Sequence, residues 1–194
     1  MVIDKENKVA YLHIPKCGGT TIKNYFEKND GIIFSNAHDK IDNFKYYFIK
    51  YDIKRQIAFI RHPVDWFMSF YSHSKYHGIY RDIVDLGFDS FVINNLSMYE
   101  NYINDITDEK TEFYDLLTLQ MVMEKEGHII DFKSNLVPRR NIISEENYNL
   151  IHDFYKNSFV ISYDQKCVVG DVSKEILKIN KPVSKGFFRI KIKR

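Results

Sequence analysis

The stretch YLHIPKCGGTTIKNYF, residues 11–26, combines the parts of a strand–turn–helix unit. An apolar run over residues 9–14 predicts a buried strand, and Gly18 and Gly19 predict the turn that follows it. From residue 20 to about residue 28, apolar residues recur at the spacing of a helix. The free N–H groups at a helix N-terminus and the helix dipole both favour a negative charge. The stretch therefore predicts a site for a phosphate-like anion.

The side chains of this turn suit the same ligand. Lys16 supplies a positive charge, Thr20 and Thr21 supply hydroxyl donors, and the two glycines allow a close approach of the backbone. The ordinary P-loop pattern G-x-x-x-x-G-K-[ST] is absent, because the lysine precedes the glycines. We expect Cys17 to fill the loop rather than to react. The alternative is a plain β–α turn in which the threonines only cap the helix.

A second segment, IAFIRHPVDWFMSFYSH at residues 57–73, also runs from a strand into a helix. Arg61 stands at the end of the strand, where open α/β sheets place ligand-binding residues, and Pro63 suits the first helical turn. We expect Arg61 and Ser69 to converge on one anion. The alternative is an Arg61–Asp65 ion pair with a solvated serine. The apolar spacing predicts that the core-facing residues are Val64, Phe67, Met68 and Tyr71.

The remaining sequence alternates between predicted strands and helices. Further strands are expected at residues 31–36, 56–60 and 158–163, and helices at residues 88–96, 110–127, 144–156 and from the last strand to about residue 178. Ser144 is the expected N-cap of the third of these helices. The alternation predicts one α/β domain over residues 1–194, with three layers around a mainly parallel sheet. No aspartate stands out at the end of a predicted strand.

Composition excludes several classes of protein. The 28 Lys and Arg residues nearly balance the 26 Asp and Glu residues, and a net charge of +2 argues against a general nucleic-acid binder. Cys17 and Cys167 are too far apart in sequence to suggest a disulfide framework or a metal site. The N-terminus lacks the apolar core of a signal peptide, and no apolar run approaches the length of a membrane span. We expect a cytoplasmic protein without membrane contact; the sequence leaves the oligomeric state open.

The two motifs together resemble the sulfotransferases that use 3′-phosphoadenosine 5′-phosphosulfate (PAPS), especially the carbohydrate branch. HIPKCGGTT resembles the 5′-phosphosulfate loop P-K-T-[AG]-G-T-[ST] of that family, and RHPVDWFMSFY resembles its 3′-phosphate motif R-[DNH]-P-x-x-[RW]-x-x-S-x-Y. Both motifs occur in order, each at a strand-to-helix junction. The resemblance covers residues 9–76 well and the later residues more weakly.

The resemblance implies a P-loop nucleotide-hydrolase-like fold that binds PAPS without metal and releases 3′-phosphoadenosine 5′-phosphate. It implies that Arg61 and Ser69 hold the 3′-phosphate. It suggests Lys185 as a third phosphate contact. This residue lies in a segment that only partly matches the R-K-G-x-x-G loop of the cytosolic enzymes. The implied acceptor is a hydroxyl of a carbohydrate or a small molecule. The residues implied around the 5′-phosphosulfate are Lys16, Cys17, Gly18, Gly19, Thr20 and Thr21, with Cys17 standing where threonine is usual.

Two residues are the candidates for catalysis. Lys16 can stabilise the charge that grows on the leaving phosphate. His38 is the expected base, because a histidine titrates near neutral pH and because this residue follows the strand expected at residues 31–36. It also matches a histidine after the second strand in the carbohydrate sulfotransferases. The alternative is a histidine of a surface loop. The Tyr-rich residues 45–51 are a candidate contact for a phenolic or lipid acceptor, or part of the core.

Two other functions remain open at this stage. A nucleotide kinase-like phosphoryl transferase needs a lysine after the last loop glycine and an acidic Mg²⁺ ligand at a strand end. Thr20 stands directly after the last loop glycine, where a phosphoryl transferase needs the lysine, so the sequence disfavours this function. A non-catalytic nucleotide-binding module fits the short chain and the replacement of threonine by Cys17.

Overall fold

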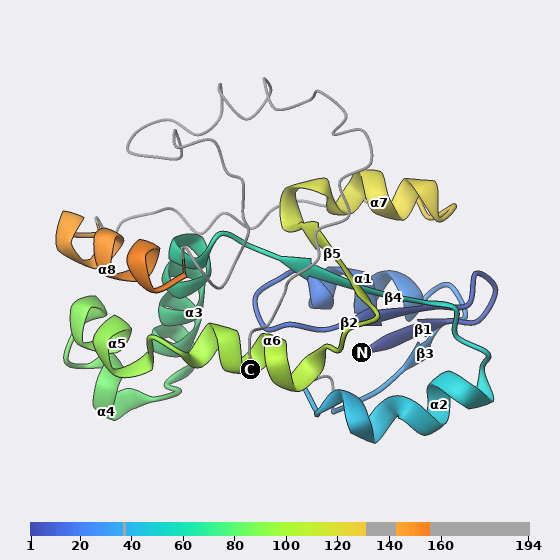
Figure 1. The fold of residues 1–194 in the computed structure, drawn as a ribbon, viewed down its shortest axis with the longest axis horizontal. Coiled ribbons are helices and arrows are strands. Elements are labelled where there is room, and N and C mark those ends of the chain that lie inside the picture. Colours follow the sequence, from blue (N-terminus) through green and yellow to red (C-terminus); the bar gives the residue numbers. More distant parts are fainter. Residues whose placement is uncertain (37, 131–142, 156–194) are drawn as a thin grey trace.

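The computed structural model describes residues 1–36, 38–130 and 143–155. They form a mixed α/β structure around a five-stranded sheet with the order β3-β1-β2-β4-β5 (Figure 1). Strand β1 is antiparallel to both of its neighbours, whereas β2, β4 and β5 are parallel. The expectation of a mainly parallel sheet is confirmed. The strands are β1 Val2–Asp4, β2 Val9–Leu12, β3 Ile32–Ile33, β4 Arg55–Ile60 and β5 Thr111–Asp115.

The two central parallel strands, β2 and β4, are mostly apolar, because both of their faces are covered. Every residue of β2 is buried, as are residues 56–59 of β4. Strands of this kind read as continuous apolar runs rather than as alternating ones. The register pairs Leu12 of β2 with Ala58 of β4, and Ala58 with Phe113 of β5. The carboxyl ends of β2, β4 and β5 therefore meet at one edge of the sheet.

Strand β1 is a feature that the sequence analysis missed. It forms a hairpin with β2 in which Val2 pairs with Tyr11. The turn is closed by Asp4, whose Oδ1 accepts hydrogen bonds from the backbone N–H groups of Glu6 and Asn7 at 3.1 and 3.2 Å. An Asp that binds the backbone two and three residues later is a common way to stabilise a turn. The hairpin places β1 between β2 and β3.

The helices occupy two regions. Helix α1 packs against β1, β2 and β3, whereas α3 contacts α4, α5, α6 and α8 in a group to one side of the sheet (Figure 1). Short 3₁₀ segments precede α2 and α7. The helices are α1 Gly19–Phe26, α2 Lys45–Lys50, α3 Pro63–His77, α4 Arg81–Val84, α5 Phe88–Asn95, α6 Met98–Ile106, α7 Leu119–Lys125 and α8 Glu145–Tyr155, and the 3₁₀ segments are η1 Ile41–Phe44 and η2 Leu116–Thr118.

Several local predictions are confirmed. The strand expected at residues 56–60 is β4, and the helices expected after Gly19, after Pro63 and at residues 88–96 are α1, α3 and α5. The strand expected at residues 9–14 forms but ends at Leu12, and that expected at residues 31–36 shrinks to the two residues of β3. Ser144 caps α8 as expected, since its Oγ accepts a hydrogen bond of 3.2 Å from the backbone N–H of Asn147.

One helix prediction was wrong over part of its length. Residues 110–127 were expected to form a single helix, but Thr111–Asp115 form strand β5 and only Leu119–Lys125 form an α-helix. The sequence TEFYD contains a β-branched residue and two aromatic residues, which favour strands, and it gains a complete ladder of hydrogen bonds from β4. Tertiary pairing therefore overrides the helical spacing of the longer segment.

The later expected elements, the strand at residues 158–163 and the helix to residue 178, lie outside the described residues, as does Lys185. Within the part of the chain that the structure describes, no helix has the length and apolar character needed to cross a membrane.

Candidate anion-binding site

Three charged residues lie just beyond or at the carboxyl ends of the parallel strands. Lys16 follows β2, Arg61 follows β4 directly, and Asp115 is the last residue of β5. Because these strands are neighbours in the order β2-β4-β5, their ends lie side by side. This edge is where open α/β sheets bind ligands. The sequence analysis identified the two cations but not the acid.

The turn after β2 has the backbone of a specialised loop. Lys16 and Gly18 both take left-handed conformations, with φ of 63° and 82°. Helix α1 begins directly afterwards, with the Gly18 carbonyl accepting from the N–H groups of Thr21 and Ile22. The first N–H groups of a helix have no partner within the helix. The N–H groups at the start of α1 therefore lie within a few residues of Lys16.

Both loop glycines are also required by packing. A Cβ atom at Gly18 would lie 2.6 Å from Leu119 Cδ1 and 2.7 Å from Leu116 Cδ1, and one at Gly19 would overlap the ring of His13. The sequence analysis assigned the glycines to a close approach of the anion. The structure adds that Gly18 packs against Leu116 of η2 and Leu119 of α7, and that its left-handed backbone, φ 82°, strains any larger residue.

Cys17 is a packing residue. Its side chain is 3% exposed, and its Sγ lies 3.8 Å from the hydroxyl of Tyr99. Burial raises the pKa of the thiol to about 12. The thiol is therefore neutral at physiological pH and is not a nucleophile. The expectation that it fills the loop is confirmed.

A buried aromatic pair joins the two predicted anion motifs. Trp66 Nε1 donates a hydrogen bond of 2.8 Å to the carbonyl of Pro15, in the first motif. Its ring stacks on Tyr99 with centroids 4.5 Å apart, and the Tyr99 hydroxyl binds the backbone of Arg61, in the second. Sequence reasoning missed Tyr99, because this residue belongs to neither motif and to none of the predicted elements; it lies in α6.

Lys16 and Arg61 lie close enough to influence each other. The pKa of Lys16 is lowered, first by burial and then by the positive charge of Arg61. Among the described residues, no carboxylate forms an ion pair with either side chain, and the considered Arg61–Asp65 pair is not formed. Two cations held close together are stabilised by a bound anion. Within the part of the chain that the structure describes, this pair is the clearest physical indication of an anionic ligand.

Asp115 corrects the expectation that no aspartate ends a strand. Its Oδ1 accepts a 2.7 Å hydrogen bond from the N–H of Leu117, which caps η2. The pKa of its carboxyl is raised to about 6, chiefly by burial; the hydrogen bond from Leu117 and the charge of Arg61 lower it, whereas nearby Asp65 raises it. The residue was missed because the segment around it was assigned to a helix. It places a carboxyl group at the same edge as the two cations.

The apolar face predicted for α3 forms largely as expected, and a polar stripe of Asp65, Ser69 and Ser72 runs beside it. Val64, Phe67 and Tyr71 are buried, and Ser69 is half-buried together with its stripe neighbours Asp65 and Ser72. The expected core residue Met68 is also only half-buried. No hydrogen bond joins Ser69 to Arg61 within the described ranges, so their convergence on one anion remains a prediction.

His38 lies against the start of the first loop. Its Nδ1 donates a 3.0 Å hydrogen bond to the backbone carbonyl of His13, and the two rings lie 4.5 Å apart. Partial burial of the ring lowers the pKa of His38 below its ordinary value, and the deeper burial of His13 lowers the pKa of that ring to about 3. Because a carbonyl can only accept, the neutral His38 ring carries its proton on Nδ1 and leaves Nε2 as the basic nitrogen.

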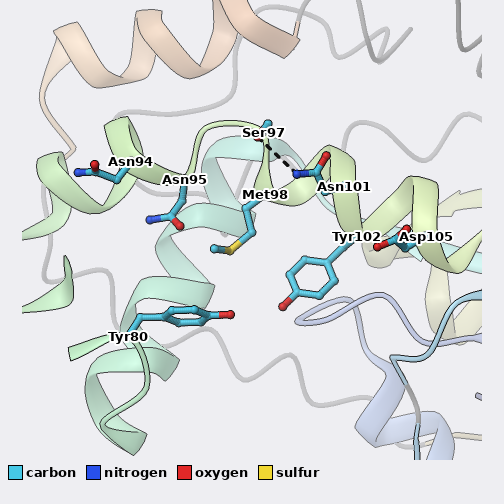
Figure 2. Close-up of a pocket in the computed structure, with 8 residues that line it drawn as sticks. All are labelled: Tyr80, Asn94, Asn95, Ser97, Met98, Asn101, Tyr102 and Asp105. Atoms are coloured by element: carbon cyan, nitrogen blue, oxygen red, sulfur yellow. Dashed lines mark hydrogen bonds between the residues drawn. The ribbon is translucent and has the colours of Figure 1, made fainter. Parts of the chain in front are cut away.

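An open pocket of about 290 Å³ lies along α5 and α6 (Figure 2). The Tyr-rich residues 45–51 do not line it. Most of them form α2, and Tyr47 of this helix packs against Phe34. Its side of α6 carries Tyr102, whose ring centroid is 6.5 Å from that of His38. The lining residues are Tyr80, Asn94, Asn95, Ser97, Met98, Asn101, Tyr102 and Asp105.

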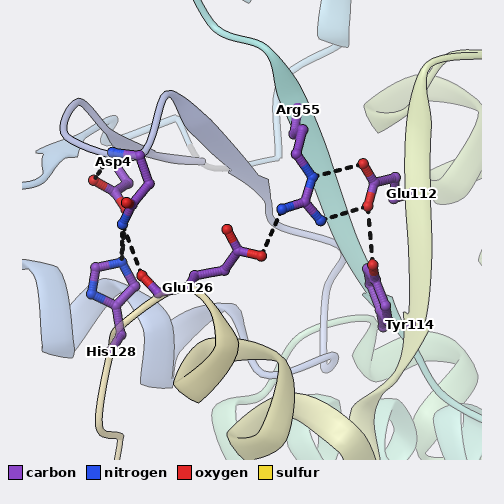
Figure 3. Close-up of polar contacts among 7 residues, drawn as sticks. Asp4, Arg55, Glu112, Tyr114, Glu126 and His128 are labelled. Atoms are coloured by element: carbon purple, nitrogen blue, oxygen red, sulfur yellow. Dashed lines mark hydrogen bonds and ion pairs between the residues drawn. The ribbon is translucent and has the colours of Figure 1, made fainter.

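The opposite edge of the sheet carries a second group of charges (Figure 3). Arg55, at the start of β4, binds Glu112 through two hydrogen bonds of 2.9 and 2.7 Å and binds Glu126 at 2.6 Å. Nearby, His128 Nε2 lies 2.7 Å from a carboxylate oxygen of Asp4. Opposite charges are paired here, unlike at the Lys16–Arg61 edge. We interpret this network as a structural one that ties the end of α7 to the sheet.

Within the described ranges, no three His, Cys, Asp or Glu side chains gather as a metal-binding group. A model of the sulfotransferase family matches residues 1–138, which is more than two thirds of the chain and includes both predicted anion motifs. No curated protein and no solved structure matches the chain.

Proposed function

The chain belongs to the sulfotransferase family, and we propose that it transfers a sulfuryl group from PAPS to a hydroxyl group of a carbohydrate or a small molecule. The observation that carries this proposal is the proximity of two cations, Lys16 and Arg61, at the carboxyl edge of the parallel strands, where no carboxylate of the described residues forms an ion pair with either one. PAPS is an anion at both ends of its ribose, so two separate cationic motifs at one sheet edge suit it.

For the donor, we place the 5′-phosphosulfate at the loop formed by residues 16–21 and the 3′-phosphate at Arg61 and Ser69. The free N–H groups at the start of α1 and the Lys16 ammonium support the first assignment. The position of Arg61 directly after β4, with Ser69 on the half-buried stripe of α3, supports the second. Lys185 is proposed as a further phosphate contact on sequence resemblance alone.

For the chemistry, we assign one role to each of two residues. The bound donor supplies a sulfuryl group whose sulfur–oxygen bond to the 5′-phosphate breaks as the acceptor oxygen bonds to sulfur. His38 Nε2 receives the proton of the acceptor hydroxyl, while its Nδ1–H stays on the carbonyl of His13, which fixes the tautomer. Lys16 stabilises the negative charge that develops on the leaving phosphate oxygen.

We infer that the whole chain, residues 1–194, forms one domain with a three-layer, P-loop-like topology. The order β1-β2-β4-β5, the loop from β2 into α1, and the packing of α1 on the sheet support this inference. We further propose that the enzyme acts in the cytoplasm.

Asp115 favours a second candidate function. A carboxyl group at the end of a strand beside a phosphate-binding loop is where phosphoryl transferases hold Mg²⁺. Here that carboxyl already caps η2, because its Oδ1 accepts the hydrogen bond from the N–H of Leu117. This engagement favours sulfuryl over phosphoryl transfer. A third possibility is a module that binds the nucleotide without catalysis.

Calorimetric titration and turnover separate these functions. The protein should bind 3′-phosphoadenosine 5′-phosphate in the presence of a chelator and more tightly than it binds ATP with Mg²⁺. Labelled PAPS should then yield a labelled product with an acceptor from a panel of sugars and phenols. Tighter binding of MgATP would support the phosphoryl transferase. Tight nucleotide binding without transfer to any acceptor would support the binding module.

A further inference from the structure

Asp115 lies between the two predicted anion motifs, although sulfuryl transfer as proposed above assigns it no role. In the sheet, Asp115 of β5 pairs with Ile60 of β4, the residue directly before Arg61. Asp115 is followed by Leu116, whose Cδ1 would lie 2.7 Å from a Cβ atom at Gly18 of the first loop. The backbone of Asp115 is thus one residue away from a contact with each motif.

The groups around the Asp115 carboxyl carry charges of both signs. Its Oδ1 accepts the hydrogen bond from the N–H of Leu117 in η2. Arg61, directly after β4, lowers the pKa of the carboxyl, whereas Asp65 of α3 raises it. In the first loop, the charge of Asp115 also acts on the buried thiol of Cys17. Within the described ranges, no ion pair neutralises Asp115, so its own charge contributes to the field at this edge.

A carboxylate at this position opposes a bound anion. Before an anion binds, the positive charge of Arg61 favours the ionised form of Asp115. An anion held by Lys16 and Arg61 offsets that positive charge and adds negative charge of its own, and both changes disfavour a second negative charge nearby. A proton on the carboxyl removes the repulsion. The protonated group still has a carbonyl oxygen that can accept from Leu117, so the cap on η2 is kept.

We propose that Asp115 takes up a proton from the solvent when a phosphate-bearing anion binds at the Lys16–Arg61 edge, so that nucleotide binding is coupled to proton uptake. One proton moves from the buffer to a carboxylate oxygen, and no other covalent bond forms or breaks. Compared with a variant that lacks the carboxylate, nucleotide affinity should therefore fall as the pH rises. That the anion is a nucleotide rests on the proposed function, whereas the response of Asp115 to an anion does not.

The pKa of the carboxyl before binding sets the pH range of the effect. Burial is the main cause that raises this pKa from 3.8 to about 6, so that Asp115 is mostly ionised at pH 7. A bound anion raises the pKa further. Affinity is then lost as the pH rises above about 6, by up to about 10-fold for each unit by which the anion raises the pKa. Below about pH 5 the carboxyl is protonated with or without the anion, and the effect vanishes.

Calorimetric titration counts the proton. The full chain is titrated with 3′-phosphoadenosine 5′-phosphate at pH 7 in Tris and in PIPES, whose ionisation enthalpies differ, and the difference in heat gives the number of protons exchanged. The phosphates of the nucleotide also titrate near this pH, so the wild type is compared with Asp115→Asn, an amide of the same shape. We expect the wild type to take up at least about half a proton more than the variant. Equal proton counts overturn the proposal.

Two matched variants assign the proton to Asp115. Asp82→Asn removes a carboxylate from the exposed surface of α4, and Asp65→Asn removes the acid that acts on Asp115; both should keep the proton uptake. For a change of one pKa unit, Asp115→Asn should bind the nucleotide about 10-fold more tightly than the wild type at pH 8, and within about 2-fold of it at pH 5. Loss of the uptake in Asp65→Asn with its retention in Asp115→Asn would move the proton to Asp65 and overturn the assignment.

Inorganic pyrophosphate, titrated in the same way, distinguishes a failure of this inference from a failure of the proposed function. If pyrophosphate binds with the expected difference in proton count but the nucleotide does not bind, the role of Asp115 is supported and sulfuryl transfer from PAPS is contradicted. Nucleotide binding and sulfuryl transfer without that difference would leave the proposed function in place and overturn the inference. Binding of neither anion would overturn both.

Discussion

The hydroxyl of Tyr99 holds the backbone of Arg61 from both sides, because it accepts a hydrogen bond from the Arg61 N–H and donates one to the Arg61 carbonyl, each 2.9 Å long. Tyr99 is fully buried and stacks on Trp66, which binds the carbonyl of Pro15. One aromatic pair therefore fixes the residue before Lys16 and the residue that carries the second cation. The relative position of the two proposed phosphate contacts depends on it.

Tyr99→Phe should weaken both folding and nucleotide binding. The substitution leaves the N–H and carbonyl of Arg61 without their partner, which costs about 1–3 kcal/mol of unfolding free energy. Nucleotide affinity should fall as well, because Arg61 is no longer held. Tyr155→Phe is the control. It also removes one tyrosine hydroxyl, which donates a partly buried hydrogen bond to the carbonyl of Leu96 and not to either anion motif. Urea unfolding and calorimetry on both variants check this; equal losses of affinity would contradict it.

Arg61→Ala should weaken the binding of 3′-phosphoadenosine 5′-phosphate by roughly 1.5–3 kcal/mol, the contribution of a charged hydrogen bond. The same substitution should change the affinity for a nucleotide without the 3′-phosphate only slightly. Arg55→Ala, at the opposite edge of the sheet, should reduce stability through Glu112 and Glu126 without a change in nucleotide affinity. If Arg61→Ala weakened both nucleotides equally in calorimetric titrations, the residue would not read the 3′-phosphate.

Lys16→Ala should lower the turnover rate more than the affinity for the donor. Its ammonium matters most when the leaving phosphate gains charge, and the loss of one such donor costs about 10²–10³-fold in rate. Lys28→Ala, an exposed lysine after α1, should leave the rate unchanged. Steady-state kinetics with labelled PAPS provide the measurement. A loss of affinity with full turnover at saturation would make Lys16 a binding residue only.

His38→Ala should reduce transfer by roughly 10²–10⁴-fold with nucleotide affinity nearly unchanged. The neutral form of the ring is the active one, and its pKa lies below the usual 6.5, so the wild-type rate should rise with pH along a limb centred below that value. The limb should be absent from the variant. His152→Ala on α8 should keep it. Persistence of the limb in His38→Ala would assign the proton to another group, such as His13.

Asp115→Asn should stabilise the folded protein at neutral pH. The folded state raises the pKa of this carboxyl from 3.8 to about 6, so ionisation above that range opposes folding, by up to about 3 kcal/mol at about 1.4 kcal/mol per pKa unit. The amide keeps the cap on η2. The gain should shrink as the pH falls toward 4. Urea unfolding against pH, with Asp82→Asn on the exposed face of α4 as control, tests this sign.

Local signals predicted the elements that carry the anion motifs. The glycines after residue 17 and Pro63 mark helix starts that need only neighbouring residues, and α1 and α3 begin there. The same local reasoning failed at Thr111–Asp115, whose strand conformation depends on pairing with β4. That failure hid Asp115 as well, because a residue in the middle of a predicted helix has no reason to face a sheet edge. Likewise, β1 forms because the turn at Asp4 returns the chain to β2.

The sequence by itself determined the two strand–turn–helix junctions, the cations Lys16 and Arg61, and the resemblance that the family match confirms. Each of these rests on residues within a few positions of one another. Only the tertiary structure decided that Tyr99 binds Arg61, that His38 rests on the His13 carbonyl, and that a pocket opens beside Tyr102. These contacts join residues distant in the chain, and the buried packing that brings them together leaves no periodic pattern in the sequence.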